Sequence, residues 1–113
     1  MPQVEEVRLD RVFNALSNPV RRQIVHRLKA GEASVSEIVV PFSISQPAIS
    51  RHLRVLEDAG LIVRSKCAQK TMCKMSPRPL KEVSDWVDNF REYWETKLER
   101  LDTYLAQIEQ ETK

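Results

Sequence analysis

The chain has 113 residues, of which 42% are hydrophobic and 30% charged, and its formal net charge is +2. This length fits one compact domain with a single core, so we expect one domain over residues 1–113 and no independent second domain. The sequence has no apolar run long enough to span a membrane, and its first ten residues are too acidic for a secretory signal. We therefore expect no membrane association and a cytoplasmic location.

The charges are distributed unevenly along the chain. Residues 1–78 contain thirteen Lys and Arg against seven Asp and Glu, whereas residues 79–113 contain five against nine. A basic body followed by an acidic segment favours a polyanionic partner for the body. Composition alone does not separate this interpretation from a chance asymmetry.

The first part of the chain carries the periodicity and the end signals of two helices. An apolar stripe at helical spacing predicts a first helix, and its members are Leu9, Val12, Phe13 and Leu16. Asn18 is a suitable cap for the next helix and Pro19 fits the first turn of that helix. The second helix is expected to end at Gly31, and its apolar positions are Val20, Ile24, Val25 and Leu28.

Two shorter helices with a tight connection are predicted next. Ser34 and Glu37 have the spacing of a capping box, and Pro41 ends the helix that they start. Ser45 is the expected cap of the following helix, which continues to Gly60. This succession predicts a helix-turn-helix over about residues 34–59.

A β-hairpin is predicted directly after the second of these helices. Residues 61–66 and 71–76 favour strands, and they flank a polar tip at residues 67–70. A hairpin at this place is typical of a wing, and a purely structural flap is the alternative. The fold class is therefore mainly α with a small β-hairpin, a winged helix-turn-helix whose wing spans about residues 61–76.

The end of the chain has a heptad pattern. Apolar residues recur from Leu80 to Ile108, interrupted only at Lys97, which predicts one long helix over about residues 80–109. An apolar seam of this size needs a cover, and a second subunit is the expected one. Packing of the seam's first half on the first helix is the partial alternative. The predicted dimer interface consists of Leu9, Val12, Phe13, Val87, Phe90, Trp94, Leu101 and Tyr104.

The residues expected to contact DNA lie on the fourth helix and on the hairpin. A helical wheel places Ile49 and Leu53 on one side of the fourth helix and a polar, basic face on the other. Arg can bind guanine with two hydrogen bonds, and the lysines of a wing suit phosphates. The predicted DNA contacts are Ser45, Gln46, Pro47, Ser50, Arg51, Arg54, Arg64, Lys66 and Lys70. Arg21 and Arg22 either reach the DNA backbone or are solvated.

No pattern in the sequence indicates an enzyme. The chain has two histidines and two glycines, and it has neither a zinc-protease pair nor a glycine-rich phosphate loop. His52 is expected to have a structural or phosphate-binding role, because no second metal ligand lies at helical spacing from it. We predict no catalytic activity, no cofactor and no metal site.

The stretch SQPAISRHLRVLEDAGLI at residues 45–62 resembles the signature of the ArsR-type winged-helix repressors, and the segment around Leu16–Pro19 is similar to the start of that family. The resemblance extends over about residues 9–105. It implies a homodimer, built mainly from the first and last helices, that binds an inverted-repeat operator in double-stranded DNA and releases it on a signal. The remaining alternative is a protein-interaction module that acts through the terminal helix.

The metal and arsenite ligands of many ArsR-type repressors are missing here. Residues 36–41, SEIVVP, lack the Cys-x-Cys pair, and no histidine follows His52. The chain resembles the members without these ligands, so the resemblance does not identify an inducer. Cys67 beside the lysine-rich tip raises the alternative of a redox-responsive repressor. Cys73 in a strand is expected to be a packing residue, and incidental thiols are the simplest reading of both.

Overall fold

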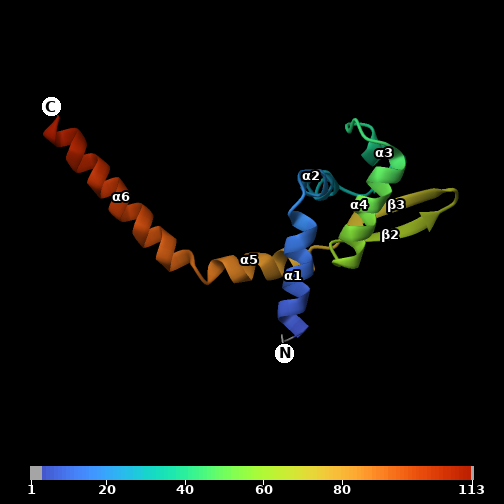
Figure 1. Cartoon of the computed structure of the whole chain (residues 1–113), viewed down its shortest axis with the longest axis horizontal. Coiled ribbons are helices and arrows are strands. Elements are labelled where there is room, and N and C mark those ends of the chain that lie inside the picture. The colour runs from blue at the N-terminus through green and yellow to red at the C-terminus, as the bar shows by residue number, and fades with distance from the viewer. Residues whose placement is uncertain (1–3, 113) are drawn as a thin grey trace. The chain divides into compact units, whose positions relative to one another are not determined.

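The computed structural model describes residues 4–112, with side chains from Arg8 onward, and it divides after Val83 into two compact units. The helices (Figure 1) are α1 (Val4–Leu16), α2 (Pro19–Leu28), α3 (Val35–Val39), α4 (Gln46–Asp58), α5 (Arg78–Asp88) and α6 (Arg91–Glu111). The strands are β1 (Ala33–Ser34), β2 (Ile62–Cys67) and β3 (Lys70–Met75). The predicted fold class, mainly α with a β-hairpin, is confirmed.

Short polar side chains start three of the helices, as predicted. The Asn18 side-chain oxygen accepts hydrogen bonds from the backbone N–H groups of Val20 and Arg21, at 2.8 and 3.2 Å. The hydroxyl of Ser34 accepts from the N–H of the residue three positions on, at 3.2 Å, and the hydroxyl of Ser45 does the same at 3.3 Å. These bonds satisfy N–H groups that have no partner inside the helix.

The end of α4 is a tight turn that starts the wing. The N–H of Gly60 donates to the carbonyl of Glu57, and the N–H of Leu61 donates to the carbonyl of Leu56, both at 2.9 Å. These two bonds form a Schellman motif, in which the residue after the helix takes a left-handed conformation. Gly60 has a φ of +77°, which a glycine adopts without steric cost. The chain therefore passes from α4 into β2 within a few residues.

The sheet has three antiparallel strands in the order β1–β3–β2. The hairpin of β2 and β3 was predicted, but β1 was not. β1 consists of Ala33 and Ser34, which pair with Cys73 and Met72. Because these partners lie about forty residues further along the chain, no local pattern indicates this strand.

The core of the first unit lies between the helices and one face of the sheet. Among the described residues, all the buried hydrophobic side chains belong to this unit. The largest of them include Ile24, Ile38, Ile49, Leu53, Leu56 and Leu61. Val12, which the sequence predicted at the dimer interface, is only 1% exposed and belongs to this core. It stabilises the fold of one chain, because the core already encloses its side chain.

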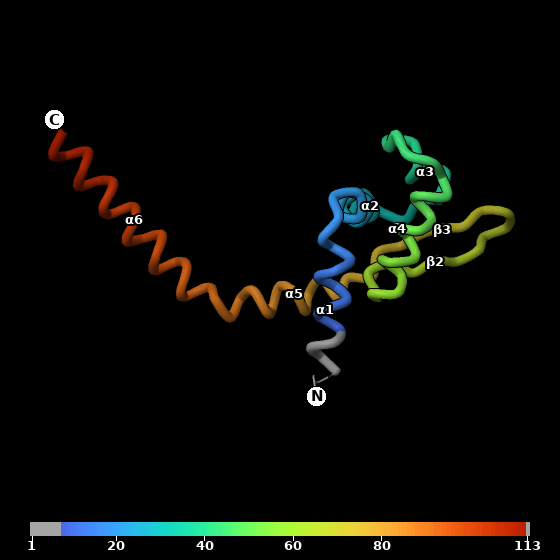
Figure 2. The backbone as a smooth tube through the Cα atoms, in the orientation of Figure 1, coloured from blue at the N-terminus to red at the C-terminus, as the bar shows by residue number. Residues whose placement is uncertain are grey.

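The predicted continuous helix over residues 80–109 is interrupted between α5 and α6 (Figure 2). The N–H groups of Asn89 and Phe90 donate to the carbonyls of Trp86 and Val87, three residues back, at 3.2 and 3.0 Å. Such bonds tighten the last turn of a helix and end it. Asn also favours turns over helix interiors, because its side chain competes for backbone groups. The prediction of one helix was therefore wrong at this point, although a long C-terminal helix is present.

α6 exposes all of its residues, including its apolar ones. Five of these follow alternating steps of four and three residues: Trp94, Leu98, Leu101, Leu105 and Ile108, with exposed fractions of 37–57%. This stripe is uninterrupted, because Leu98 takes the place of Lys97 in the predicted heptad. No described helix combines the length and the apolar character that crossing a membrane requires.

Candidate nucleic-acid interface

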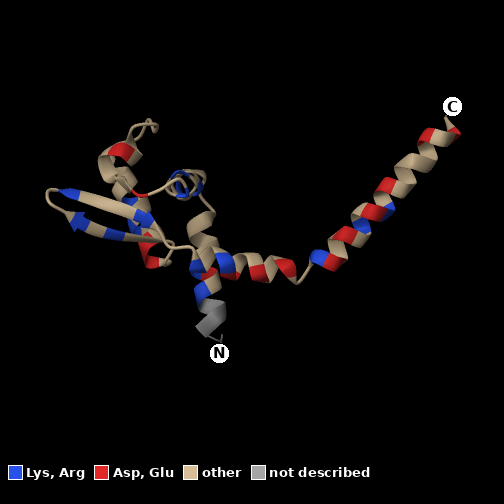
Figure 3. Ribbon diagram, turned by 180° about the vertical axis from the view of Figure 1, so that it is seen from behind, with Lys and Arg blue, Asp and Glu red and all other residues tan. Residues whose placement is uncertain are grey.

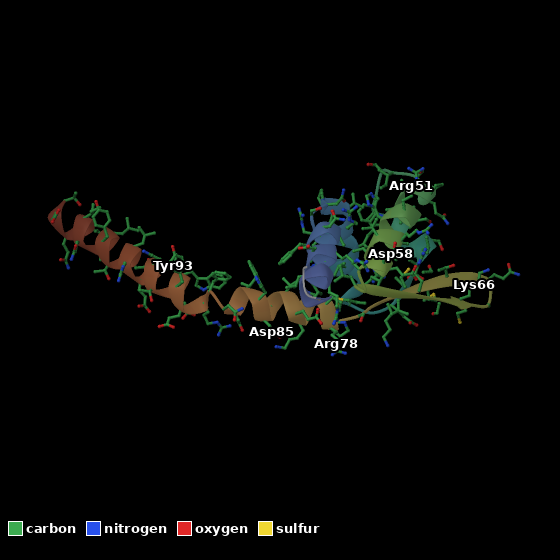
Figure 4. All side chains as sticks on the ribbon, turned by 60° about the horizontal axis from the view of Figure 1, so that its bottom comes forward. Arg51, Asp58, Lys66, Arg78, Asp85 and Tyr93 are labelled. Atoms are coloured by element: carbon green, nitrogen blue, oxygen red, sulfur yellow. The ribbon has the colours of Figure 1, made fainter. Side chains whose placement is uncertain are left out.

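α4 has the two faces that its sequence predicts. Ile49, Leu53 and Leu56 are 0% exposed and anchor the helix in the core. On the other side Arg51 and Arg54 are exposed and Ser50 is half-buried. Ser45, Gln46 and Pro47, at the start of the helix, are exposed as well. Figure 4 labels Arg51 in the first half of α4 and Asp58 at the end of this helix. The structure therefore brings the six residues predicted from this helix to one exposed end and face.

The hairpin carries cationic residues on both of its strands (Figure 3). Arg64 pairs with buried Cys73 across the ladder, so Arg64 and Lys66 share the face of the sheet that meets the core. Lys70 and Lys74 lie on the opposite face, because side chains alternate along a strand. Lys66 and Lys70 are both exposed. These two side chains are thus accessible from different sides of the wing.

Arg64 differs from the other predicted contacts, because it already has a carboxylate partner. Its guanidinium donates to Oε1 of Glu57 at 2.8 Å, and the two side chains are 27% and 37% exposed. The hydrogen bond from Arg64 lowers the pKa of Glu57, and the same bond raises the pKa of Arg64. Glu57 was not among the residues predicted from the sequence. The signal that identifies it is the turn at Gly60, which brings residues seven positions apart together.

Arg21 and Arg22 are held at the end of α1. Arg21 donates to the carbonyls of Ala15 and Asn14, at 2.7 and 3.0 Å, and Arg22 donates to the carbonyl of Leu16 at 2.8 Å. These carbonyls belong to the last turn of α1 and have no partner within the helix. The sequence left two alternatives for Arg21 and Arg22, contact with the DNA backbone or a solvated side chain. Neither describes them fully, because both arginines cap the end of α1.

His52 connects α4 with α2. Its Nδ1 lies 3.4 Å from Nη1 of Arg21. A guanidinium only donates hydrogen bonds, so Nδ1 accepts and the imidazole is neutral with its proton on Nε2. Burial and the positive charge of Arg21 lower the pKa of His52. The neutral ring therefore stabilises the fold above the ordinary histidine pKa of about 6.5, and this contribution is lost as the pH falls through the lower folded value.

The two cysteines lie apart on the hairpin. Cys67 is exposed and pairs with Lys70, whereas Cys73 is buried and pairs with Arg64. Three ladder positions separate them, which corresponds to at least about 10 Å between Cα atoms, on opposite faces of the sheet. This separation exceeds the reach of a disulfide. Burial raises the pKa of the Cys73 thiol, as expected of a packing residue. In the part of the chain that the structure describes, no three His, Cys, Asp or Glu side chains gather into a metal-binding group.

Comparison with known proteins identifies relatives of this chain. Residues 18–63 match the family model of bacterial regulatory proteins of the arsR family. The chain is 34% identical over 82 residues to the transcriptional repressor SdpR of Bacillus subtilis, covering 73% of this chain and 91% of that protein.

Solved structures with the same fold include the crystal structure of the ArsR family transcriptional regulator RHA00566. It is 36% identical, has a TM-score of 0.74, and the match covers 84% of this chain and 97% of that one. A homodimeric winged helix-turn-helix DNA-binding domain from Mycobacterium bovis, solved by NMR, has a TM-score of 0.62 at 22% identity, over 75% and 79% of the two chains. The chain therefore belongs to the arsR family of bacterial transcription regulators, has their winged helix-turn-helix fold, and is not an enzyme.

Proposed function

We propose that this chain is a cytoplasmic transcriptional repressor that binds an inverted-repeat operator in double-stranded DNA as a homodimer. The observation that carries the proposal is the exposed polar and basic face of α4, opposite side chains that are 0% exposed, with a cationic hairpin directly after it. In winged-helix proteins such a helix enters the major groove with its first residues toward the bases. SdpR, a transcriptional repressor, supports the direction of regulation.

The two parts of the interface have different roles in this proposal. Arg51 and Arg54 present guanidinium groups to base edges, where bidentate bonds to guanine discriminate between sequences. Ser45, Gln46, Pro47 and Ser50 approach the same groove from the exposed start of α4. Lys66 and Lys70 neutralise phosphates on the wing, which positions the protein without reading sequence.

The homodimer is proposed from the apolar side chains that one chain leaves exposed. Phe13 is 40% exposed, Phe90 45% and Trp94 40%, and the stripe of α6 continues beyond them. Exposed apolar side chains of this size favour aggregation of a monomer, whereas a second copy would cover them. The proposed interface keeps Leu9, Phe13, Val87, Phe90, Trp94, Leu101 and Tyr104, and it gains Leu98 and Leu105. The M. bovis domain with the same fold is homodimeric, which agrees with a homodimer here but does not identify its interface.

Isolation of the bound DNA tests the proposed function. Crosslinking the protein to fragmented DNA and sequencing the enriched fragments should yield an inverted repeat. Its half-sites should lie about 10 base pairs apart or at a multiple of that spacing, since a twofold dimer presents two recognition helices one helical turn apart. If the protein showed no salt-dependent binding to any DNA, the proposal would be wrong and a protein-interaction role of α6 would replace it.

A redox-responsive repressor is the second candidate, and the exposure of Cys67 on the wing supports it. Because Cys73 is out of reach, the thiol of Cys67 would have to be oxidised alone or with a thiol from another molecule. Peroxide should then weaken operator binding in the natural chain but not in Cys67→Ser. Equal operator affinities with and without peroxide would contradict redox switching and favour a repressor without it.

A further inference from the structure

The joint between the recognition helix and the wing contains an ion pair that the sequence pattern did not indicate. Glu57 lies in the last turn of α4 and Arg64 in the first half of β2, with 2.8 Å between Oε1 and Nη2. Both side chains are partly buried, so solvent screens this pair less than an ion pair on an open surface. The bond therefore links the two elements that we propose to contact DNA.

The backbone gives this ion pair a fixed geometry. The Schellman motif at Gly60 ends α4, and the N–H of Ser76 donates to the carbonyl of Leu61 at 2.8 Å, which ties the base of the hairpin. Ile62, two residues before Arg64, is 2% exposed on the same face of the sheet. Arg64 thus extends from an anchored strand toward α4, and its side chain is 27% exposed.

Glu57 also lies close along α4 to a residue of the proposed base-reading face. Arg54 precedes it by three residues, a spacing at which side chains on a helix are neighbours. The charge of Arg54 contributes to the lowered pKa of Glu57, after the larger effect of the hydrogen bond from Arg64. The carboxylate is therefore attracted to two guanidinium groups, and in this structure Arg64 holds it.

We propose that Glu57 is a positioning residue for DNA recognition, which fixes the wing against α4 by binding Arg64 and thereby leaves Arg54 free for the bases. This inference rests on the proposed function. It assigns Arg64 to the internal joint and not to a phosphate, unlike the role predicted from the sequence. Arg64 then adds to the formal charge of the wing without adding a DNA contact.

The variant Glu57→Gln tests this role, with Asp58→Asn as its matched control. Asp58 is exposed, adjacent in α4 and carries the same charge. Glu57→Gln should release Arg64 to a phosphate, so the salt slope for random DNA should steepen by about 0.9. The ratio of operator to random affinity should fall by about fivefold to tenfold, the low end of what one bidentate base contact discriminates. Asp58→Asn should change neither the slope nor the ratio. Equal behaviour of the two variants would overturn the proposal.

The variant Arg64→Gln approaches the same joint from the wing and covers the case in which Glu57→Gln does not fold. Our proposal expects an unchanged salt slope and a reduced ratio of operator to random affinity, because free Glu57 would then attract Arg54. A phosphate contact predicts the reverse, a slope that is smaller by about 0.9 with an unchanged ratio. The second result would overturn the role of Glu57 while leaving the proposed repressor intact. Absence of DNA binding by the natural chain would instead contradict the proposed function.

Discussion

The two units of this chain differ in how far they bury their apolar side chains. The first unit encloses most of its large hydrophobic residues, several of them at 0% exposure, whereas α6 leaves Trp94, Leu98 and Leu101 at 40–57%. Most of the stability of a helix in a protein comes from packing of its apolar face and not from the helix alone. The first unit therefore buries the side chains that stabilise its own fold, whereas the apolar stripe of α6 is exposed in one chain and covered in the proposed dimer.

The largest expected effect comes from placing charges in the stripe of α6. Trp94→Asp combined with Leu101→Asp should abolish the dimer, because four carboxylates would be buried across the seam. Light scattering at micromolar concentration should report about twice the chain mass for the natural protein and one chain mass, or aggregates, for the variant. The control is Thr96→Asp with Thr103→Asp, which has the same spacing and charge on exposed positions outside the stripe. If the variant with Trp94→Asp and Leu101→Asp remained a dimer, the proposed role of the α6 stripe would be refuted.

The next largest effect is expected from truncating one leucine to alanine in each of the two units. Leu53→Ala should destabilise the first unit by about 2–5 kcal/mol, because it leaves a cavity in a fully buried site. Leu98→Ala, at a side chain that is 57% exposed, should cost the isolated chain little and should weaken the dimer. Chemical denaturation at several protein concentrations separates the two outcomes. Similar losses for both variants at low concentration would mean that α6 is packed within its own chain.

A smaller effect concerns DNA recognition, which we assign to the first unit. Arg54→Ala should weaken operator binding by about 1–3 kcal/mol more than binding to random DNA. Lys70→Ala should weaken both about equally and reduce the salt slope by about 0.9. Light scattering should give both variants the mass of the natural dimer. If the lysine variant changed sequence preference and the arginine variant did not, the wing would be the reader.

The smallest effect lies at the tip of the hairpin. Ala68 is the described non-glycine residue with a positive φ, at 58°. An Ala side chain in this conformation costs roughly 1 kcal/mol; Gly removes this cost, but its larger loss of conformational entropy on folding offsets part of the gain. Ala68→Gly should therefore raise the midpoint of thermal unfolding slightly, and Gln69→Gly should lower it. A lower midpoint for Ala68→Gly would show that Ala68 makes a favourable contact at the tip.

Local signals in the sequence were sufficient to predict most of the helices and the hairpin of the first unit. Asn18, Ser34 and Ser45 start helices through hydrogen bonds within three residues, and Gly60 ends α4 in the same local way. Such bonds depend on neighbours in sequence, so their residue types can be read directly. The two faces of α4 followed from helical periodicity for the same reason.

The features that the sequence did not reveal depend on distant or alternative neighbours. β1 exists because Ala33 and Ser34 meet β3, and the burial of Val12 depends on how α1 packs. The heptad continued through Asn89 because a periodicity count weighs apolar positions and ignores helix stops. Formal charge likewise cannot show that Arg64 is bound to Glu57.

The turn at Gly60 also bears on how the DNA specificity proposed here could be transferred between regulators. Because the helix end, the hydrogen bond from Ser76 to Leu61 and the pair of Glu57 with Arg64 lie within one short segment, residues 45–76 form a cassette that carries its own link between helix and wing. Grafting α4 alone from one regulator into another would separate Glu57 from its arginine. Grafting the whole cassette would transfer the reading helix together with the geometry that aims it.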